Sequence, residues 1–392
     1  APGFEGDNQK MELAINLTRI TFPFLFFISL ASFFSAILNS HNRFAIASAA
    51  PIILNIMLIG VLFYGKILND QLVYYLSYSV TLAGIIQLIF LYIFVKKFYL
   101  PKFTFKVTLD DRVKIFFRKL LPSIFSSGVT QINILVGTII ASFQAGAVSY
   151  LYYADRIYQI NLAIAGIAIG TVILPKLSSY VQNEKKDEII FIQNKALELS
   201  LFLSIPATVA LLISSEQIIS ALFGYGTFDE DGVKNSAKAL FYFSLGLPAF
   251  ALIKVFSRHN TKTPFYISMV SVLINIFISI FYFDNFGFII IPIATSISSW
   301  FNSIVLFIFL KKNNLFNFNF LFLSRFLRIL IATSIMGLFF NYLTNFFDAN
   351  MQYEQNFKAA YLIGIVFLSL ISYFLIAVLI KAFKISDIKL KY

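Results

Sequence analysis

Long apolar runs separated by short polar segments make up most of the chain. Each run is about 20 residues long, which is the helical length needed to cross a hydrocarbon core roughly 30 Å thick. The runs show no period-two alternation of apolar and polar residues, so the pattern predicts helices and not a barrel. The eleven predicted spans are 20–39, 45–65, 73–95, 119–142, 147–175, 196–214, 236–256, 265–283, 287–310, 326–345 and 359–380.

Lys and Arg are distributed unevenly between the segments that connect the spans. If the first residues lie outside, the inner segments hold 23 of the 31 Lys and Arg residues and the outer segments hold six. By the positive-inside rule, the carboxyl end is then cytoplasmic and the amino end is outside. An outside amino end that begins at Ala1, with no signal peptide, leads us to expect that earlier spans precede this sequence.

Composition agrees with a membrane protein. Hydrophobic residues make up 59% of the chain and charged residues 13%, and the mean hydropathy is +0.81. Soluble domains carry about 25% charged residues. The net charge of +12 lies between the spans, which favours membrane orientation over nucleic-acid binding.

The sequence offers little for enzymatic or metal chemistry. Cysteine is absent and the two histidines, His41 and His259, are far apart, which argues against thiolate and histidine metal sites. The chain has no Walker motif, dinucleotide fingerprint or nucleophile elbow. We therefore expect no cofactor and no metal.

A polar stripe lies within the fifth predicted span. Tyr152, Arg156 and Gln159 share one helical face, with Ser149 one turn earlier, and Asp155 is adjacent to the arginine. Charges at membrane depth are costly and commonly mark a functional site. The favoured interpretation is that Arg156 faces a binding cavity; the alternative is a structural ion pair with Asp155 or with partner helices.

The fourth span carries a second stripe formed by Ser123, Ser127, Gln131 and Thr138. Hydroxyls and amides at such positions often hold helices together, so the stripe indicates either interhelical contacts or cavity lining. Asn275 in the eighth span is open to the same two interpretations.

Short motifs along the chain occur in a recognisable order, at residues 1–4, 17–23, 37–40, 42–44, 51–56, 152–156, 173–178, 225–228 and 261–264. In these motifs the chain resembles the MurJ (MviN) family of lipid II flippases, most closely from residue 1 to about 310. Each motif is loose by itself, and together they are specific.

The resemblance implies an all-α polytopic membrane protein with the MATE-like fold of the MOP superfamily. The eleven spans would be helices four to fourteen of a fourteen-helix fold. Residues 1–142 would form the rest of the first six-helix bundle plus helix seven, and 143–310 the second bundle. Residues 311–392 would add two helices, 326–345 and 359–380, that form a groove for a lipid tail.

The resemblance also implies a function in peptidoglycan biosynthesis at the bacterial inner membrane. The protein would move lipid II, an undecaprenyl-pyrophosphate-linked disaccharide peptide, to the outer leaflet by alternating access. Expected partners are lipid II and membrane lipids but no nucleic acid, and the protein is expected to be a monomer. Arg156 would correspond to a cavity arginine that binds the pyrophosphate. The predicted substrate-binding residues are Arg156, Asp155, Ser149, Tyr152, Gln159, Ser127 and Gln131.

Two departures from the family pattern stand out. The first three helices and their arginines are absent, so we do not expect this sequence alone to flip substrate. About five residues found in relatives are also missing next to Ser257.

Three rival functions remain at this point: an exporter of another MOP type for an O-antigen carrier or a drug, a membrane glycosyltransferase, and a non-transporting cell-wall scaffold. The glycosyltransferase would need an outward carboxylate, which only the loop at Asp229–Asp231 offers.

Overall fold

The computed structural model describes residues 2–65, 71–100, 110–172, 186–256, 262–313 and 316–383. Within these ranges all regular elements are helices, as predicted. The expected deletion next to Ser257 and the motif at 173–178 lie outside the described residues.

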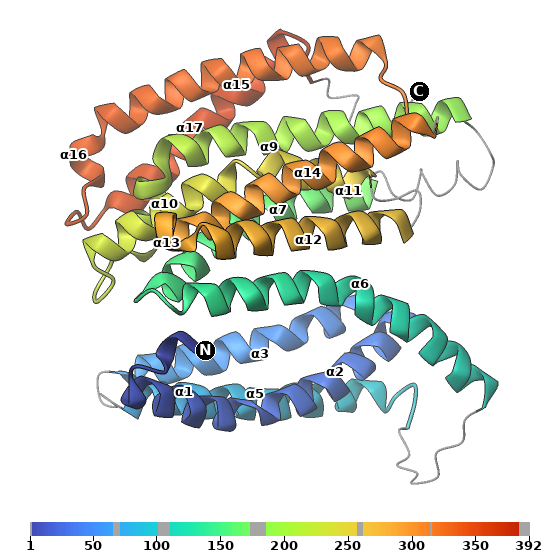
Figure 1. Cartoon of the computed structure of the whole chain (residues 1–392), viewed down its shortest axis with the longest axis vertical. Coiled ribbons are helices and arrows are strands. Elements are labelled where there is room, and N and C mark those ends of the chain that lie inside the picture. The colour runs from blue at the N-terminus through green and yellow to red at the C-terminus, as the bar shows by residue number, and fades with distance from the viewer. Residues whose placement is uncertain are drawn as a thin grey trace. The chain divides into compact units, whose positions relative to one another are not determined.

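The chain divides into two compact units, residues 3–118 and 119–392, and each is described by itself. The first unit holds α1 (Asn8–Thr21), α2 (Pro23–Ser40), α3 (Phe44–Phe63), α5 (Leu72–Val95) and the first residues of α6 (Asp111–Ala141). Helix α5 contacts α1, α2 and α3 (Figure 1). The domain boundaries expected at 142 and 310 stay a prediction.

Two local features set the packing of the first unit. Pro23 has no N–H to donate and begins α2, which separates this helix from α1. Gly84 allows α5 to lie close to α2, because a Cβ at this position would be 2.8 Å from a ring carbon of Phe24. Thr81 on α5 donates to the carbonyl of Ile20 on α1 over 2.5 Å.

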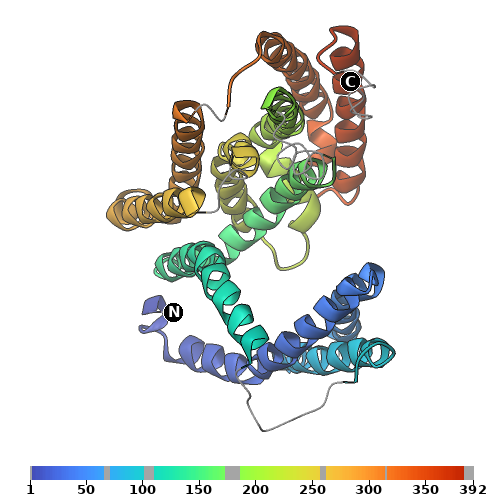
Figure 2. The same cartoon turned by 90° about the vertical axis from the view of Figure 1, so that its right-hand side faces the viewer.

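The second unit contains the remaining helices, with α9 packed against α7, α10, α11, α15 and α17 (Figures 1 and 2). Its elements are the larger part of α6, from residue 119 on, and α7 (Ala147–Val172), α9 (Lys186–Phe223), α10 (Glu230–Ser244), α11 (Leu247–Phe256), α12 (Lys262–Phe281), α13 (Phe283–Phe286), η3 (Gly287–Ile289), α14 (Ile290–Lys312), α15 (Phe320–Phe346), α16 (Asp348–Met351) and α17 (Lys358–Leu379).

Most predicted spans coincide with helices that can cross a membrane. Among the described residues, eight helices are long and apolar enough, and the pair α10 and α11, bent by 42°, makes a ninth. The predicted fourth and fifth spans are also helical, as α6 and α7. They are not among the nine found in the described residues, where Gln131–Ala141 of α6 counts as a shorter apolar helix.

The bend between α10 and α11 frees backbone carbonyls, and α14 supplies the missing donors. The Ser296 hydroxyl donates to the carbonyl of Tyr242 over 2.6 Å, and the Trp300 indole donates to that of Leu245 over 2.9 Å. A Cβ at Gly246 would lie 3.1 Å from the Ser296 Cα, so the glycine permits this close approach. The bend is therefore part of the packing between these helices.

Helix α17 supplies a hydrogen-bond donor to another carbonyl that lacks its partner within the helix. Pro206 lies inside α9 and cannot donate to the carbonyl of Phe202 one turn earlier. The hydroxyl of Tyr373, a fully buried residue of α17, donates to that carbonyl over 2.8 Å. The hydrogen bond replaces the donor that proline removes and fastens α17 to α9.

We predict that Tyr373→Phe lowers the free energy of unfolding by about 1 kcal/mol, because it leaves a buried carbonyl unpaired. Adding Pro206→Ala to Tyr373→Phe should recover part of this loss, since residue 206 then donates to Phe202 itself. Thermal unfolding of the purified protein in detergent measures both effects. Tyr342→Phe, at an exposed tyrosine of α15, is the control. Equal melting temperatures for Tyr373→Phe and Tyr342→Phe would contradict the prediction.

Candidate functional site

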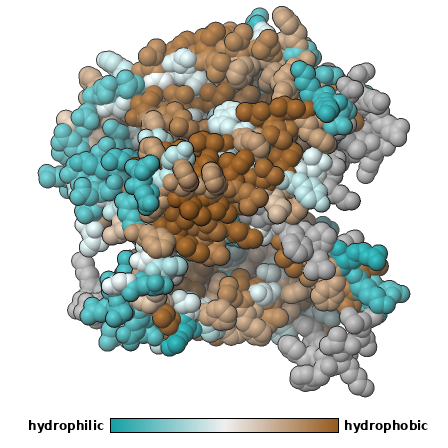
Figure 3. Space-filling view, in the orientation of Figure 1, coloured by the Kyte–Doolittle hydropathy of each residue, from teal (hydrophilic) through white to brown (hydrophobic). Residues whose placement is uncertain are grey.

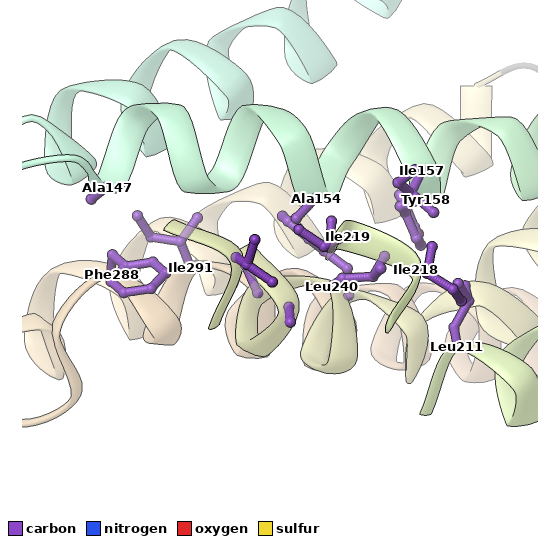
Figure 4. Close-up of a cluster of buried hydrophobic side chains, with 14 of the residues drawn as sticks. Ala147, Ala154, Ile157, Tyr158, Leu211, Ile218, Ile219, Leu240, Phe288 and Ile291 are labelled. Atoms are coloured by element: carbon purple, nitrogen blue, oxygen red, sulfur yellow. The ribbon is translucent and has the colours of Figure 1, made fainter. Parts of the chain in front are cut away.

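Helix α7 presents an apolar face to the core and a polar face away from it. Ala154, Ile157 and Tyr158 are buried on the side of α7 that packs against α9, α10 and α11, in a cluster that includes Ile219 and Leu240 (Figure 4). Since these contacts fix the rotation of α7, the side chains on its other face are held at the surface of the second unit.

The polar face carries the predicted stripe. Ser149, Tyr152, Arg156 and Gln159 are all exposed, and Asp155 beside them is half-buried. Their spacing of three or four residues places them on successive turns of one helix. The structure therefore brings five of the seven predicted binding residues together on α7.

The Arg156 guanidinium lies over the ring of Tyr152, with 4.6 Å between the guanidinium carbon and the ring centroid. A cation over a tyrosine ring is stabilised by the negative face of the π-system. The contact orients the guanidinium while its N–H groups remain available at the exposed edge.

Asp155 has a different partner. Its carboxylate accepts a hydrogen bond from the side-chain amide of Gln159, one turn further along α7. For this described pair, the structure records no ion pair between Asp155 and Arg156, although the two are adjacent in sequence. The two side chains therefore form no direct ion pair, and the cavity-facing role of Arg156 stays a prediction. Gln159 instead holds the carboxylate.

Of the two predicted residues of α6, only Gln131 has a described side chain. Gln131 is exposed, and the described side chains include no hydrogen bond between it and the α7 face. Ser127 lies on α6, but its side chain is outside the described part of the structure. Thr138 donates to the carbonyl of Ile134 in its own helix over 2.9 Å.

Asn275 makes contacts between helices. Its amide on α12 donates to the hydroxyls of Thr295 over 3.1 Å and Ser298 over 3.4 Å on α14, and Ser279 donates to its carbonyl over 3.4 Å. These contacts support the interhelical interpretation. No group of three or more His, Asp or Glu side chains in the described residues could hold a metal ion.

A large apolar groove lies between α9, α11, α14 and α15. Its volume is about 560 Å³. The lining includes Leu201, Leu252, Phe307, Phe322 and Phe326. The family resemblance implied a groove made by the last two spans, which stays a prediction. The groove described here has α15 as one wall and includes no residue of α17 in its lining. Its other walls come from segments far apart in sequence, which no local pattern could identify.

A carboxylate on α9, next in sequence to the lining residue Leu197, is shared by two cations. The Glu198 carboxylate lies 2.9 Å from the Lys195 ammonium and 2.7 Å from the Arg325 guanidinium. The pair between Glu198 and Arg325 joins α9 to α15.

The acidic loop before α10 caps that helix. Asp229 is the N-cap residue of α10, and its carboxylate accepts a hydrogen bond from the backbone N–H of Gly232 over 2.8 Å. Glu230 lies 2.8 Å from the Lys234 ammonium one turn along the same helix. These contacts match the capping role expected of such a sequence.

Comparisons with known proteins give a consistent result. A family model described as "Lipid II flippase MurJ" matches residues 1–361. A probable lipid II flippase MurJ of Rhizobium tropici is 34% identical over 405 residues, covering 99% of this chain and 75% of the relative. A probable lipid II flippase MurJ of Rickettsia prowazekii is 37% identical, covering 80% of this chain and 63% of the relative.

A solved structure described as a lipid II flippase MurJ in an inward closed conformation is also similar. It has a TM-score of 0.78 at 26% identity, and the match covers 95% of this chain and 75% of that one. The predicted all-helical flippase fold is confirmed by this match.

We predict that Asp229→Ala lowers the free energy of unfolding by about 1 kcal/mol through loss of the cap, whereas Asp229→Asn leaves it unchanged because the amide oxygen still accepts. Chemical denaturation of the purified protein measures both. In cells, Asp229→Asn should retain full function. Loss of function in this stable variant would instead point to a catalytic carboxylate.

Proposed function

This chain belongs to the MurJ family of lipid II flippases, and we propose that it moves lipid II from the inner to the outer leaflet of the cytoplasmic membrane. The family model matches residues 1–361 of 392, and the Rhizobium tropici relative supports the same family over 99% of the chain. The chain spans between about two thirds and three quarters of the length of the relatives it matches.

The protein is a multi-pass membrane protein, since its described residues hold at least eight helices able to cross a bilayer. The proposed orientation has a cytoplasmic carboxyl end, supported by the 23 Lys and Arg residues on the inner segments. The proposed partners are lipid II and the surrounding lipids, and the proposed working state is a monomer.

The observation that carries the proposal is the exposed guanidinium of Arg156. The lipid II headgroup is attached through a pyrophosphate, whose oxygens accept paired N–H donors. A guanidinium presents such donors in a planar fork and stays charged at all relevant pH values. Because Tyr152 stacks on the guanidinium and Gln159 binds Asp155, this fork is oriented and is not consumed by the neighbouring carboxylate.

The groove supports the proposal for the other part of the substrate. A polyprenyl tail is entirely apolar, and the groove walls are almost entirely apolar side chains such as Leu201 and Phe322. The tail would be retained by contact with these walls while the headgroup is transferred. In an alternating-access cycle, the pyrophosphate site opens in turn to the two sides of the membrane.

Family membership also decides between the rival functions. MurJ proteins are transporters, so the glycosyltransferase alternative is excluded; of the loop on which it depended, Asp229 serves as a helix cap. The family model favours lipid II over other lipid-linked or drug substrates.

We predict that Arg156→Ala, introduced into the full-length version of this chain, abolishes growth of cells that lack their own lipid II flippase. Arg156→Lys should fail in large part as well, because an ammonium cannot make the paired contact. Lys312→Ala, at an exposed cation of α14, is the control and should support growth. Normal growth with Arg156→Ala at equal expression would exclude the proposed role.

Tyr152 is expected to act by positioning the Arg156 guanidinium with its ring. Tyr152→Phe keeps the ring and should bind lipid II as the parent protein does. Tyr152→Leu should weaken binding by about threefold, corresponding to the usual strength of an exposed cation–π contact. Native mass spectrometry with added lipid II measures both. Equal weakening by Phe and Leu would show that the hydroxyl, and not the ring, matters.

A further inference from the structure

Trp300 on α14 takes part in both the apolar groove and the bend between α10 and α11. Its side chain lines the groove. Its indole N–H donates to the carbonyl of Leu245, in the bend, over 2.9 Å. An indole has one N–H and no acceptor, so this bond uses the whole hydrogen-bonding capacity of the side chain. The surface that the ring presents to the groove is therefore apolar.

The Trp300 ring is not enclosed by the protein, since 39% of the residue is exposed. Figure 3 shows hydrophobic residues gathered over the part of the second unit where α12 and α14 are labelled in Figure 1. In a membrane, a helix face of this kind borders the hydrocarbon core. An apolar chain that occupies the groove thus has an open side of the indole ring to pack against.

The bend depends on donors that α14 supplies. The Gly246 N–H donates to the carbonyl of Phe243 over 3.0 Å, one residue short of the helical partner at Tyr242. The Ser296 hydroxyl donates to the Tyr242 carbonyl instead. Together with Trp300, this serine replaces backbone donors at the bend. The geometry of the bend is therefore tied to the positions of two side chains of α14.

An aromatic residue of α7 lies across the same bend. The Tyr158 ring stacks on Phe243 at the end of α10, with ring centroids 5.5 Å apart, and meets Phe250 of α11 edge-on at 5.8 Å. Tyr158 is buried, and its hydroxyl has no hydrogen-bond partner among the described residues. Its ring contacts therefore fix its position, and these contacts involve both arms of the bend. A change in the bend angle moves Phe243 and Phe250 relative to each other and disturbs Tyr158.

The same tyrosine connects the bend to the polar face of α7. Tyr158 lies two residues beyond Arg156 on this helix. A helix turns as a unit, so contacts that hold Tyr158 also hold the direction in which Arg156 points. Trp300 thus contacts the bend, the bend contacts Tyr158, and Tyr158 shares a helix with Arg156.

We propose that Trp300 and Tyr158 couple binding of the lipid tail in the groove to binding of pyrophosphate at Arg156. The tail packs on the open side of the Trp300 ring and holds the indole against Leu245, which fixes the bend and, through Tyr158, the rotation of α7. Arg156 then loses less freedom when it binds the anion. Each ligand therefore strengthens binding of the other by the same factor.

This coupling rests on the proposed flippase function, in which the tail and the pyrophosphate belong to one substrate. It adds a basis for substrate selection. A molecule that carries both parts is favoured over a free pyrophosphate, which leaves the groove empty, and over a lipid that has no pyrophosphate to offer Arg156.

The test uses a separate probe for each part: inorganic pyrophosphate, and the uncharged polyprenol undecaprenol. Isothermal calorimetry on the purified chain in phosphatidylcholine nanodiscs gives the Kd of pyrophosphate with and without undecaprenol. We expect undecaprenol to lower this Kd by about fivefold, the equivalent of one hydrogen bond. Trp300→Phe keeps a ring in the groove but has no N–H, so its two Kd values should agree. Ile304→Val, one turn further along the groove lining, is the control and should keep the fivefold effect.

Tyr158 provides a second, matched pair of variants. Tyr158→Phe keeps both ring contacts and removes only a hydroxyl without a partner, so the fivefold effect should persist. Tyr158→Leu removes both ring contacts and should abolish the effect while pyrophosphate still binds. Native mass spectrometry confirms that undecaprenol binds to each variant.

Trp300 also reports the coupling directly, because it is the only tryptophan among the 392 residues. In detergent, pyrophosphate should shift the Trp300 emission of the parent chain and of Tyr158→Phe, but not that of Tyr158→Leu. Pyrophosphate binding with the same Kd in the presence and absence of bound undecaprenol would overturn the coupling alone. No pyrophosphate binding to the parent chain, or binding that survives Arg156→Ala, would overturn the proposed headgroup site and the coupling with it.

Discussion

The requirement that backbone groups in hydrocarbon find partners within the protein governs the second unit. Where a helix is broken, a neighbouring helix supplies the missing donor. Tyr373 on α17 serves the carbonyl left by Pro206, and Ser296 and Trp300 on α14 serve the bend between α10 and α11. Each break thus creates a specific contact, and the elements around the apolar groove are joined to one another through positions that would weaken an isolated helix.

Packing against the core also determines the orientation of α7, the helix that carries Asp155 and Arg156. Helix α7 could not present Arg156 in a fixed direction by its polar residues alone. Its direction comes from the apolar face, where Ala154 is fully buried against the core shown in Figure 4. Polar contacts then orient the side chains of this face: the Tyr152 ring lies under the Arg156 guanidinium, and the Gln159 amide donates a hydrogen bond to the Asp155 carboxylate.

Much of this could be predicted from sequence, because helical periodicity encodes which face of a helix is polar. The spans, the grouping of Tyr152, Arg156 and Gln159, and the cap at Asp229 all depend on local spacing. Local spacing does not indicate which helices pack against one another. The groove depends on a 42° bend between α10 and α11 and on walls from four helices, and the contacts of Asn275 depend on which helix lies opposite. These features arise only when distant segments pack.

Lys358 and Arg156 show that the position of a cation in the hydropathy pattern does not by itself determine its role. Lys358 falls in a connecting segment by sequence, yet it is buried, with two carbonyls as hydrogen-bond acceptors and two tyrosine rings around it. These contacts join the start of α17 to the carbonyl of Gly224, so Lys358 has a structural role. Arg156 lies in a predicted span, yet it is exposed and contacts one ring. Since a guanidinium has five N–H donors and a π-contact uses none of them at its edge, Arg156 keeps the capacity to bind an anion. Arg156 is therefore the proposed binding residue and Lys358 a structural one, because they differ in the number of N–H donors that remain without an acceptor within the protein.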